Sequence, residues 1–212
     1  MDDIRIRHLV VGPLGTNCFI VSCTKSSEAI IIDPGGDSPS IISAVKEDGL
    51  RPVMIVLTHG HSDHMASAAG LTREFDIGIA MHGDDIETMK KSVEDSPHWG
   101  LGDVEYPEVK TLLSAGDTIR FGEVEAEVRH TPGHTLGGIS LVLGDAVFAG
   151  DTLFAGSIGR TDFFGGDMET LVASVRSELF TLPDDTAVFC GHGPATTIGE
   201  EKVRNPYLNG TF

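Results

Sequence analysis

Cysteine is scarce in this sequence, and the few cysteines are not paired. Only three occur among 212 residues, at Cys18, Cys23 and Cys190, with no CxxC pair and no spacing typical of a structural zinc site. Cys18 and Cys190 lie in the apolar stretches NCFIV and AVFCG, where a thiol usually behaves as a small core residue. We therefore expect these two cysteines to be buried in the core.

Long hydrophobic runs are also missing. No apolar stretch approaches the roughly 18 residues needed to span a bilayer, and the mean hydropathy is +0.03. The N-terminal segment MDDIRIRHLV places two acids before its basic residues and lacks the apolar core and cleavage site of a secretory signal. The sequence therefore predicts a soluble, cytoplasmic protein with no membrane partner.

Basic residues are few. Lys and Arg total 15 against 32 Asp and Glu, which gives a formal net charge of −17 at pH 7. Such a charge repels phosphate backbones, whereas nucleic-acid binding draws on clustered Lys and Arg. We therefore expect no nucleic-acid partner, and we expect much of the acid to form a solvated surface that favours solubility.

The chain carries two comparable series of strands followed by helices. In the first series, hydrophobic patterning predicts strands over 4–10, 17–23, 28–36, 52–58 and 77–82, and helices over 38–49, 62–75 and 83–95. An irregular stretch with Pro97 and Pro107 follows. The second series has predicted strands over 118–122, 124–131, 138–144, 146–151 and 186–191, and helices over 168–180 and near 198–204.

No linker rich in Pro, Gly or Ser and no charge block divides the two series. We therefore predict that residues 1–212 form one domain in which the two units pack as a single body.

A cluster of imidazoles follows the apolar run PVMIVL. Residues 58–64 read THGHSDH, and they lie where a buried strand is predicted to end and a helix to begin. In an extended segment, side chains two residues apart point the same way, so His59 and His61 can direct two nitrogens at one point. Asp63 and His64 come where the chain turns into the helix, so they can reach a second point. This arrangement favours two adjacent metal ions.

Three further residues stand in a similar context. His134 in RHTPGHT, Asp151 in AVFAGDTLF and His192 in AVFCGHGP each follow a strand-like run and lie near glycine. Any one of them alone could be a turn residue. Because strand ends from different parts of a fold can meet at one cleft, their shared context indicates a common site.

Taken together, the motifs THxHxDH, TPGHT, GDTLF and GHGP, in this order, resemble those of the metallo-β-lactamase superfamily over nearly the whole chain. The resemblance implies an α+β fold, a four-layer αββα sandwich with its metals at one edge between two sheets. It also implies that His59, His61 and His134 bind one metal, that Asp63, His64 and His192 bind the other, and that Asp151 bridges them. His8, His82, His98 and His130 match no ligand position. His82 and His130 are the better candidates for contacts with the ligands, and Asp33 is a turn residue that the resemblance allows near the metals.

The implied ligands predict a divalent metal cofactor and hydrolytic chemistry. Imidazole and carboxylate ligands suit zinc, iron or manganese, and two divalent ions with zinc as the default are expected. Two such ions lower the pKa of a bridging water towards about 7, which makes a hydroxide nucleophile available. Asp63 could then both ligate and accept a proton. A thiolate leaving group, with a pKa near 8.5, hardly needs a general acid, so thioesters are an easy substrate class.

The segment GDTLFAGSIGRTDFFGGD resembles the short bacterial glyoxalase II-like hydrolases, which are related to hydroxyacylglutathione hydrolase. A small-molecule thioester substrate is therefore expected. Arg160 could bind a substrate carboxylate or could brace its loop by pairing with Asp162. The chain ends about 20 residues after His192, and Gly193-Pro194 follow that His where the full-length enzymes have a Tyr. Because of these two departures, the sequence does not identify the thiol part of the substrate, and glutathione is one candidate.

Three alternatives share the motifs. A persulfide dioxygenase of this fold would use one iron, here held by His59, His134 and Asp151. A lactonase or β-lactam hydrolase is a second alternative, although the lack of a signal peptide weakens the β-lactamase interpretation. A non-catalytic sensor would need less than a full ligand set. The sequence leaves the oligomeric state open.

Overall fold

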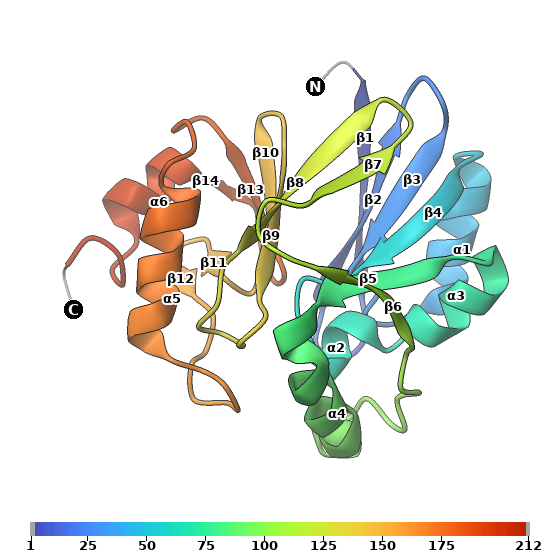
Figure 1. Ribbon diagram of the computed structural model, residues 1–212, viewed down its shortest axis with the longest axis horizontal. Coiled ribbons are helices and arrows are strands. Elements are labelled where there is room, and N and C mark those ends of the chain that lie inside the picture. Colours follow the sequence, from blue (N-terminus) through green and yellow to red (C-terminus); the bar gives the residue numbers. More distant parts are fainter. Residues whose placement is uncertain (1–2, 211–212) are drawn as a thin grey trace.

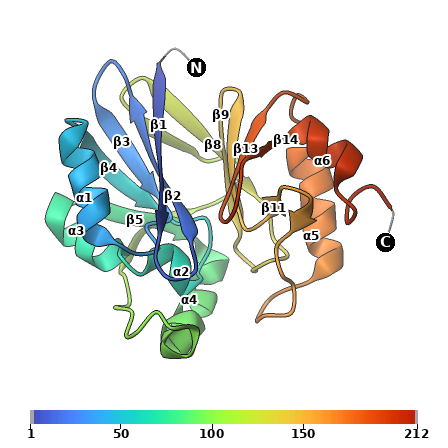
Figure 2. The ribbon, with the colours of Figure 1, turned by 180° about the vertical axis from the view of Figure 1, so that it is seen from behind.

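Two six-stranded sheets pack face to face in the computed structural model, which describes residues 3–210. Helices cover the outer face of each sheet, with α1 and α3 on one side of the molecule and α5 and α6 on the other (Figures 1 and 2). This is the four-layer αββα sandwich of the α+β class, so the predicted architecture is confirmed.

The first sheet has the strand order β1-β2-β3-β4-β5-β6, antiparallel from β1 to β3 and parallel from β3 to β6. Its strands are β1 (Ile4–Val11), β2 (Thr16–Cys23), β3 (Glu28–Ile32), β4 (Arg51–Val56), β5 (Gly78–His82) and β6 (Val109–Leu113). Because β3, β4 and β5 are parallel, their carboxyl ends lie at the same edge of the sheet. The segments that follow these three strands are therefore neighbours.

The second sheet has the order β14-β13-β10-β9-β8-β7. Its strands are β7 (Thr118–Phe121), β8 (Val124–His130), β9 (Ile139–Leu143), β10 (Ala146–Gly150), β13 (Ala187–Cys190) and β14 (Thr196–Thr197). A separate hairpin is formed by β11 (Leu153–Phe154) and β12 (Ser157–Ile158). Strands β10 and β13 run parallel, so the residues directly after them, including Asp151 and His192, are brought to one edge.

The helices are α1 (Ser38–Glu47), α2 (Ser62–Met65), α3 (Ala68–Phe75), α4 (Ile86–Asp95), α5 (Met168–Ser174) and α6 (Ile198–Arg204). Short turns η1 (Gly83–Asp85) and η2 (Ser96–Trp99) flank α4, and a π-helical turn η3 (Val175–Leu179) continues α5. Among residues 3–210, no helix is both long and apolar enough to cross a membrane.

Two predictions of secondary structure were wrong. The helix expected over 62–75 is two helices, because the chain breaks at Ser67, whose backbone N–H donates to the carbonyl of Pro34 at 2.9 Å. The segment that forms strand β6 was expected to be irregular rather than a strand. It is an edge strand in which only Leu113 is fully buried, so it lacks the alternating hydrophobic pattern that identifies a half-buried strand.

Three apolar layers hold the sandwich together. The central layer between the sheets contains Phe121 and Phe148, both fully buried. Outside the first sheet, Ile41 and Val45 lie four residues apart on one face of α1 and pack on the strands. Leu171 and the residues that follow it in α5 and η3 cover the second sheet in the same way. Packing on both faces fixes each sheet, and thereby the positions of the strand ends.

Candidate metal centre

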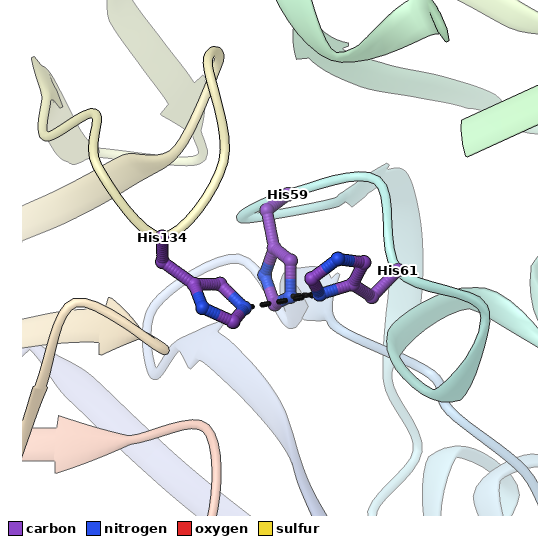
Figure 3. Close-up of side chains that lie close together, drawn as sticks. All are labelled: His59, His61 and His134. Carbon is purple, nitrogen blue, oxygen red and sulfur yellow. Dashed lines mark hydrogen bonds between the residues drawn. The ribbon is translucent and has the colours of Figure 1, made fainter. Parts of the chain in front are cut away.

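Three imidazoles converge at one point and form what we call the first ligand group, His59, His61 and His134 (Figure 3). The Nδ1 atom of His61 lies 3.0 Å from Nε2 of His59 and 3.0 Å from Nε2 of His134. Two of these side chains follow β4 in the first sheet, and the third follows β8 in the second sheet. The group therefore spans both halves of the sandwich.

A second ligand group comprises Asp63, His64 and His192. The Nε2 atoms of His64 and His192 are 3.2 Å apart, and Nε2 of His192 lies 3.2 Å from Oδ2 of Asp63. Asp63 and His64 belong to the single turn of α2, whereas His192 follows β13. This group also takes residues from both halves of the chain.

Asp151 lies between the two groups. One of its carboxylate oxygens, Oδ1, is 3.4 Å from Nε2 of His64, and the other is 3.6 Å from Nε2 of His134. Oδ1 is buried and has no hydrogen-bond partner within residues 3–210. A buried carboxylate oxygen left in this way is costly unless a cation compensates it. The position and the orphaned oxygen therefore fit metal ions held on both sides of Asp151.

Glycine makes the approach of Asp151 to the second ligand group feasible. A Cβ atom on Gly191 would lie 2.1 Å from Oδ1 of Asp151 and 2.8 Å from the ring of His64. Only a residue without a side chain fits there. All seven residues predicted from the sequence are thus brought to one cleft at the edge between the sheets.

Two imidazoles of the first ligand group, those of His59 and His61, resist protonation. Burial lowers the pKa of His59 well below its usual value, and nearby imidazoles lower it further. Burial likewise lowers the pKa of His61 to about 3, with a further contribution from His134. A neutral imidazole is the form that binds a metal, so these rings are in the ligating state at neutral pH.

The second ligand group has the opposite electrostatic character. Burial lowers the pKa of His64, but three surrounding carboxylates outweigh it and raise the pKa to about 10; they belong to Asp151, Asp63 and Asp33. Burial raises the pKa of the Asp63 carboxyl, but the neighbouring His64 and His192 outweigh burial and lower it. The pKa of His192 is raised in spite of burial by its hydrogen bond to Asp63. This half of the cleft stabilises positive charge.

Outer partners orient the rings. Asp33, at the end of β3, accepts hydrogen bonds from the backbone N–H of Thr58 at 2.7 Å and from its hydroxyl at 2.6 Å, and Nδ1 of His64 lies 2.9 Å from the same carboxylate. Nδ1 of His134 lies 2.7 Å from the carbonyl oxygen of Arg160. Such partners fix which ring nitrogen is available to a metal. Asp33 therefore contacts the candidate ligand His64, in keeping with the position near the metals that the resemblance allowed.

Two outer residues escaped the sequence analysis. The side-chain amide of Asn17 donates to the carbonyls of Cys190 and Gly193, both at 2.9 Å, and so brackets His192. Nε2 of His8 lies 2.7 Å from Oδ1 of Asn17 and completes the set of partners. Nothing in the sequence distinguishes Asn17 from any other polar residue near the start of a strand, because its partners are about 170 positions away.

His82 and His130, expected as candidates for contacts with the ligands, pair with each other instead. Their rings stack with centroids 4.2 Å apart and an interplanar angle of 5°. Nδ1 of His82 accepts from the backbone N–H of Asp84, and Nε2 of His130 contacts the carbonyl of Leu136. With Asp84, the two rings form a separate set whose ligand-type atoms lie within 4.8 Å of one another, and none of the three residues belongs to either ligand group.

A pocket of about 490 Å³ opens onto the ligand residues. Its walls come from α4 and η2 on one side and from the segment 154–164 on the other, and they include Thr88, Lys91, Ser92, Trp99, Leu101, Phe154, Ile158, Arg160, Phe163 and Phe164. The ring of Phe163 packs edge-to-face with those of His61 and Trp99, with ring centroids 5.6 and 5.7 Å apart. An apolar wall therefore extends directly from the first ligand group.

Arg160 pairs with Asp162, through Nε at 2.9 Å and through an Nη atom at 2.7 Å. Its guanidinium also lies over the ring of Phe163, 4.2 Å from the centroid. Of the two roles considered for Arg160, bracing of the loop is the one seen directly. Because a guanidinium has five N–H groups, this pairing leaves others for a bound molecule.

Comparison with known sequences gives one family and many relatives. A family model described as the metallo-beta-lactamase superfamily matches residues 11–192. "Hydroxyacylglutathione hydrolase GloC" of Haemophilus influenzae is 36% identical over 97% of this chain and 99% of its own. "Probable metallo-hydrolase YqgX" of Bacillus subtilis is 36% identical over 98% of this chain and 99% of its own.

Several solved structures are similar to this chain over nearly its whole length. The BLEG-1 B3 metallo-beta-lactamase superposes with a TM-score of 0.90 at 34% identity, covering 97% of this chain and 100% of that one. TTHA1623 in a di-iron-bound form has a TM-score of 0.87 at 35% identity, with coverage of 95% and 100%. ETHE1 from Myxococcus xanthus has a TM-score of 0.83 at 29% identity, with coverage of 97% and 85%.

Proposed function

Since the chain belongs to the metallo-β-lactamase superfamily, a superfamily of metallo-hydrolases, we propose that it is a binuclear hydrolase of glyoxalase II type that cleaves a small-molecule thioester. One observation carries the proposal. Two groups of three ligand-type residues flank a single carboxylate, that of Asp151, whose buried Oδ1 has no partner within residues 3–210. Seven residues of this kind can hold two ions, and the number of ions bound per chain separates this proposal from a one-iron site that uses part of the same set.

We assign the first ligand group to one divalent ion, the second ligand group to another, and Asp151 to both. Two ions held in this way would supply a water acidic enough to be a nucleophile at neutral pH and a Lewis acid for the carbonyl oxygen. Zinc is the default for imidazole and carboxylate ligands, and iron or manganese suits the same donors. The di-iron form of TTHA1623 makes iron the first alternative to measure.

Asp63 has the second role of proton acceptor in this proposal. Its Oδ2 lies 3.2 Å from Nε2 of His192 and 3.3 Å from the hydroxyl of Thr16, which orients the carboxylate. The side chain lines the pocket and is 15% exposed, so a proton from the attacking water can reach it. The charges of the neighbouring imidazoles hold the pKa of this carboxyl low, so it is ionised before the reaction begins.

The pocket suits a thioester with an apolar body and an anionic end. Phe163 and Trp99 offer ring faces and edges beside the first ligand group. Lys91 and Arg160 line the same pocket in a chain with a net charge of −17. We assign Arg160 to the substrate carboxylate through the N–H groups that Asp162 leaves free. A departing thiolate, with a pKa near 8.5, needs no proton donor.

The test combines metal analysis with turnover of S-lactoylglutathione. We expect two divalent ions per chain and a thioester cleavage that is lost on chelation and restored by adding back the metal. The name of the Haemophilus relative supports this choice of substrate. A protein that holds two ions yet leaves lactoyl, acetyl and longer acyl thioesters intact would contradict the proposal.

A second candidate is a mononuclear-iron persulfide dioxygenase. His59, His134 and Asp151 lie together in the same cleft and form a set of two imidazoles and one carboxylate, which is a common iron site. This candidate predicts one iron per chain and oxygen uptake that depends on a persulfide. Lactone and β-lactam hydrolysis, the latter suggested by the likeness to the BLEG-1 metallo-beta-lactamase, belong to the same panel of assays.

A further inference from the structure

Asp85 is a buried carboxylate that lies next to the candidate metal centre without belonging to it. It is the last residue of η1, directly before α4, and its exposed fraction is 0%. Oδ2 accepts hydrogen bonds from the backbone N–H of Gly60 and the hydroxyl of Thr135, both at 2.8 Å. Oδ1 accepts from the backbone N–H of Gly137 at 2.7 Å and from the hydroxyl of Thr88 at 3.3 Å.

Three of these four donors belong to the two loops that carry the first ligand group, whereas Thr88 belongs to α4. Gly60 stands between His59 and His61, and Thr135 directly follows His134. One loop leaves β4 of the first sheet and the other leaves β8 of the second sheet. Asp85 thus ties together two segments that lie more than 70 residues apart in the sequence.

The glycines give independent evidence for this tie. A Cβ atom on Gly60 would lie 2.7 Å from the carbonyl oxygen of Asp85, and one on Gly137 would lie 2.6 Å from its backbone nitrogen and 2.9 Å from its Cβ. Real Cβ contacts are not this close, so both loops approach Asp85 as closely as backbone permits. Neither glycine has a left-handed backbone that would itself demand glycine.

Asp85 does not act as a metal ligand in this arrangement. A carboxylate has about four lone-pair positions, and four protein donors already occupy them. Hydrogen bonds to a charged group contribute more than neutral ones, roughly 1.5–3 kcal/mol each, and an unpaired buried donor is costly. The spacing of the two loops is therefore determined by where this carboxylate lies.

We propose that Asp85 is a positioning residue that sets the separation between the His59–His61 loop and His134, and so shapes the first ligand group alone. The second ligand group has other outer partners, Asp33 and Asn17. Asp33 also reaches the first group through Thr58, whose hydroxyl lies 3.1 Å from Nδ1 of His59. The inference rests on the proposed function insofar as the first ligand group binds a metal. Its structural part, the tie between the loops, holds without any metal.

The test is Asp85→Asn, in which one oxygen becomes an amide that cannot accept. In metal-stripped protein we expect the amide proton resonance of Gly60 or Gly137 to move and its hydrogen exchange to accelerate. Titration with Co²⁺ is then followed through the paramagnetically shifted imidazole protons of His134 and His192. We expect the affinity of the first ligand group to fall about 10–100-fold, as for loss of an outer partner, and that of the second to stay within about threefold.

Two further variants keep the test decisive. Thr135→Val removes one donor at a similar side-chain volume, so it gives a smaller loss with the same selectivity if Asp85→Asn does not fold. Glu201→Gln is the matched control, since Glu201 is 3% exposed and accepts from Thr196, Gly156 and Asn205, none of which lies on the loops that carry the first ligand group. It should destabilise the fold without selective loss of Co²⁺.

The inference would be overturned by unchanged amide resonances of Gly60 and Gly137, or by equal loss of affinity in both ligand groups. If the wild-type protein binds no Co²⁺, the proposed function is contradicted. The amide measurements would still decide whether Asp85 ties the two loops together.

Discussion

The two ligand groups of the cleft are stabilised in different ways. In the first group, burial lowers the pKa of His59 and His61, and Asp85 acts on the backbone of the loops that carry the group. In the second group, a carboxylate contacts a ring directly, because Asp33 lies 2.9 Å from Nδ1 of His64. The first group depends on loop geometry and on one contact that reaches His59 from Asp33 through Thr58, whereas the second depends on charge. Substitutions should therefore separate the two groups.

The largest effect is expected where the groups meet. Asp151→Ala removes the carboxylate that lies between the two groups, so metal content should fall and thioester turnover should drop by more than the roughly 100-fold upper figure for loss of an outer partner. Metal analysis and steady-state kinetics measure this. Retention of two ions with near-normal turnover would show that Asp151 is not shared.

Asp33→Asn tests the charge-based group. We expect the Co²⁺ affinity of the second ligand group to fall about 10–100-fold, because the amide cannot serve both His64 and the hydroxyl of Thr58. The first group should be affected less, through Thr58 alone. Combined with Asp85→Asn, the two losses should add if the groups are anchored independently. A strong interaction between the two substitutions would contradict that independence.

Phe163→Ala tests whether this ring supports metal binding by the first ligand group or contacts only the substrate. Loss of roughly 1.5 kcal/mol of apolar contact would raise KM for a thioester roughly tenfold. Metal stoichiometry should not change, since the ring of Phe163 meets His61 only at its edge. Phe164→Ala, a neighbouring ring that is 46% exposed, is the matched control and should change KM less. A fall in metal content would place Phe163 among the outer partners of His61.

The smallest effect is expected from Asn17→Ala, which acts on the backbone on either side of His192. Two acceptors lose their donor, so the free energy of unfolding should fall by about 1–3 kcal/mol. Asn209→Ala changes an exposed amide and should stay within about 0.5 kcal/mol. Denaturant unfolding of the metal-stripped proteins makes the comparison. Equal stability of both variants would show that the bracket around His192 is not stabilising.

Much of this architecture could be predicted from the sequence because local patterns carried it. The run before Thr58 and the glycine beside His192 indicated strand ends, and strand ends in such folds converge. Asp85 and Asn17 could not be found in this way. Each is an ordinary polar residue whose partners lie far away in the chain, and only the folded molecule brings them together. Edge strand β6 was missed for a related reason, since most of its side chains face solvent.

The origin of the seven side chains in both sheets has a consequence for assembly. Before the sheets dock, only the segment from His59 to His64 can chelate, and it does so through few donors. The full set exists only in the completed sandwich, so an ion that prefers that set adds its binding free energy to the docked state alone. Occupancy of the cleft would then report that the halves have joined correctly, and starvation for metal would lower the protein's resistance to unfolding and proteolysis as well as its turnover.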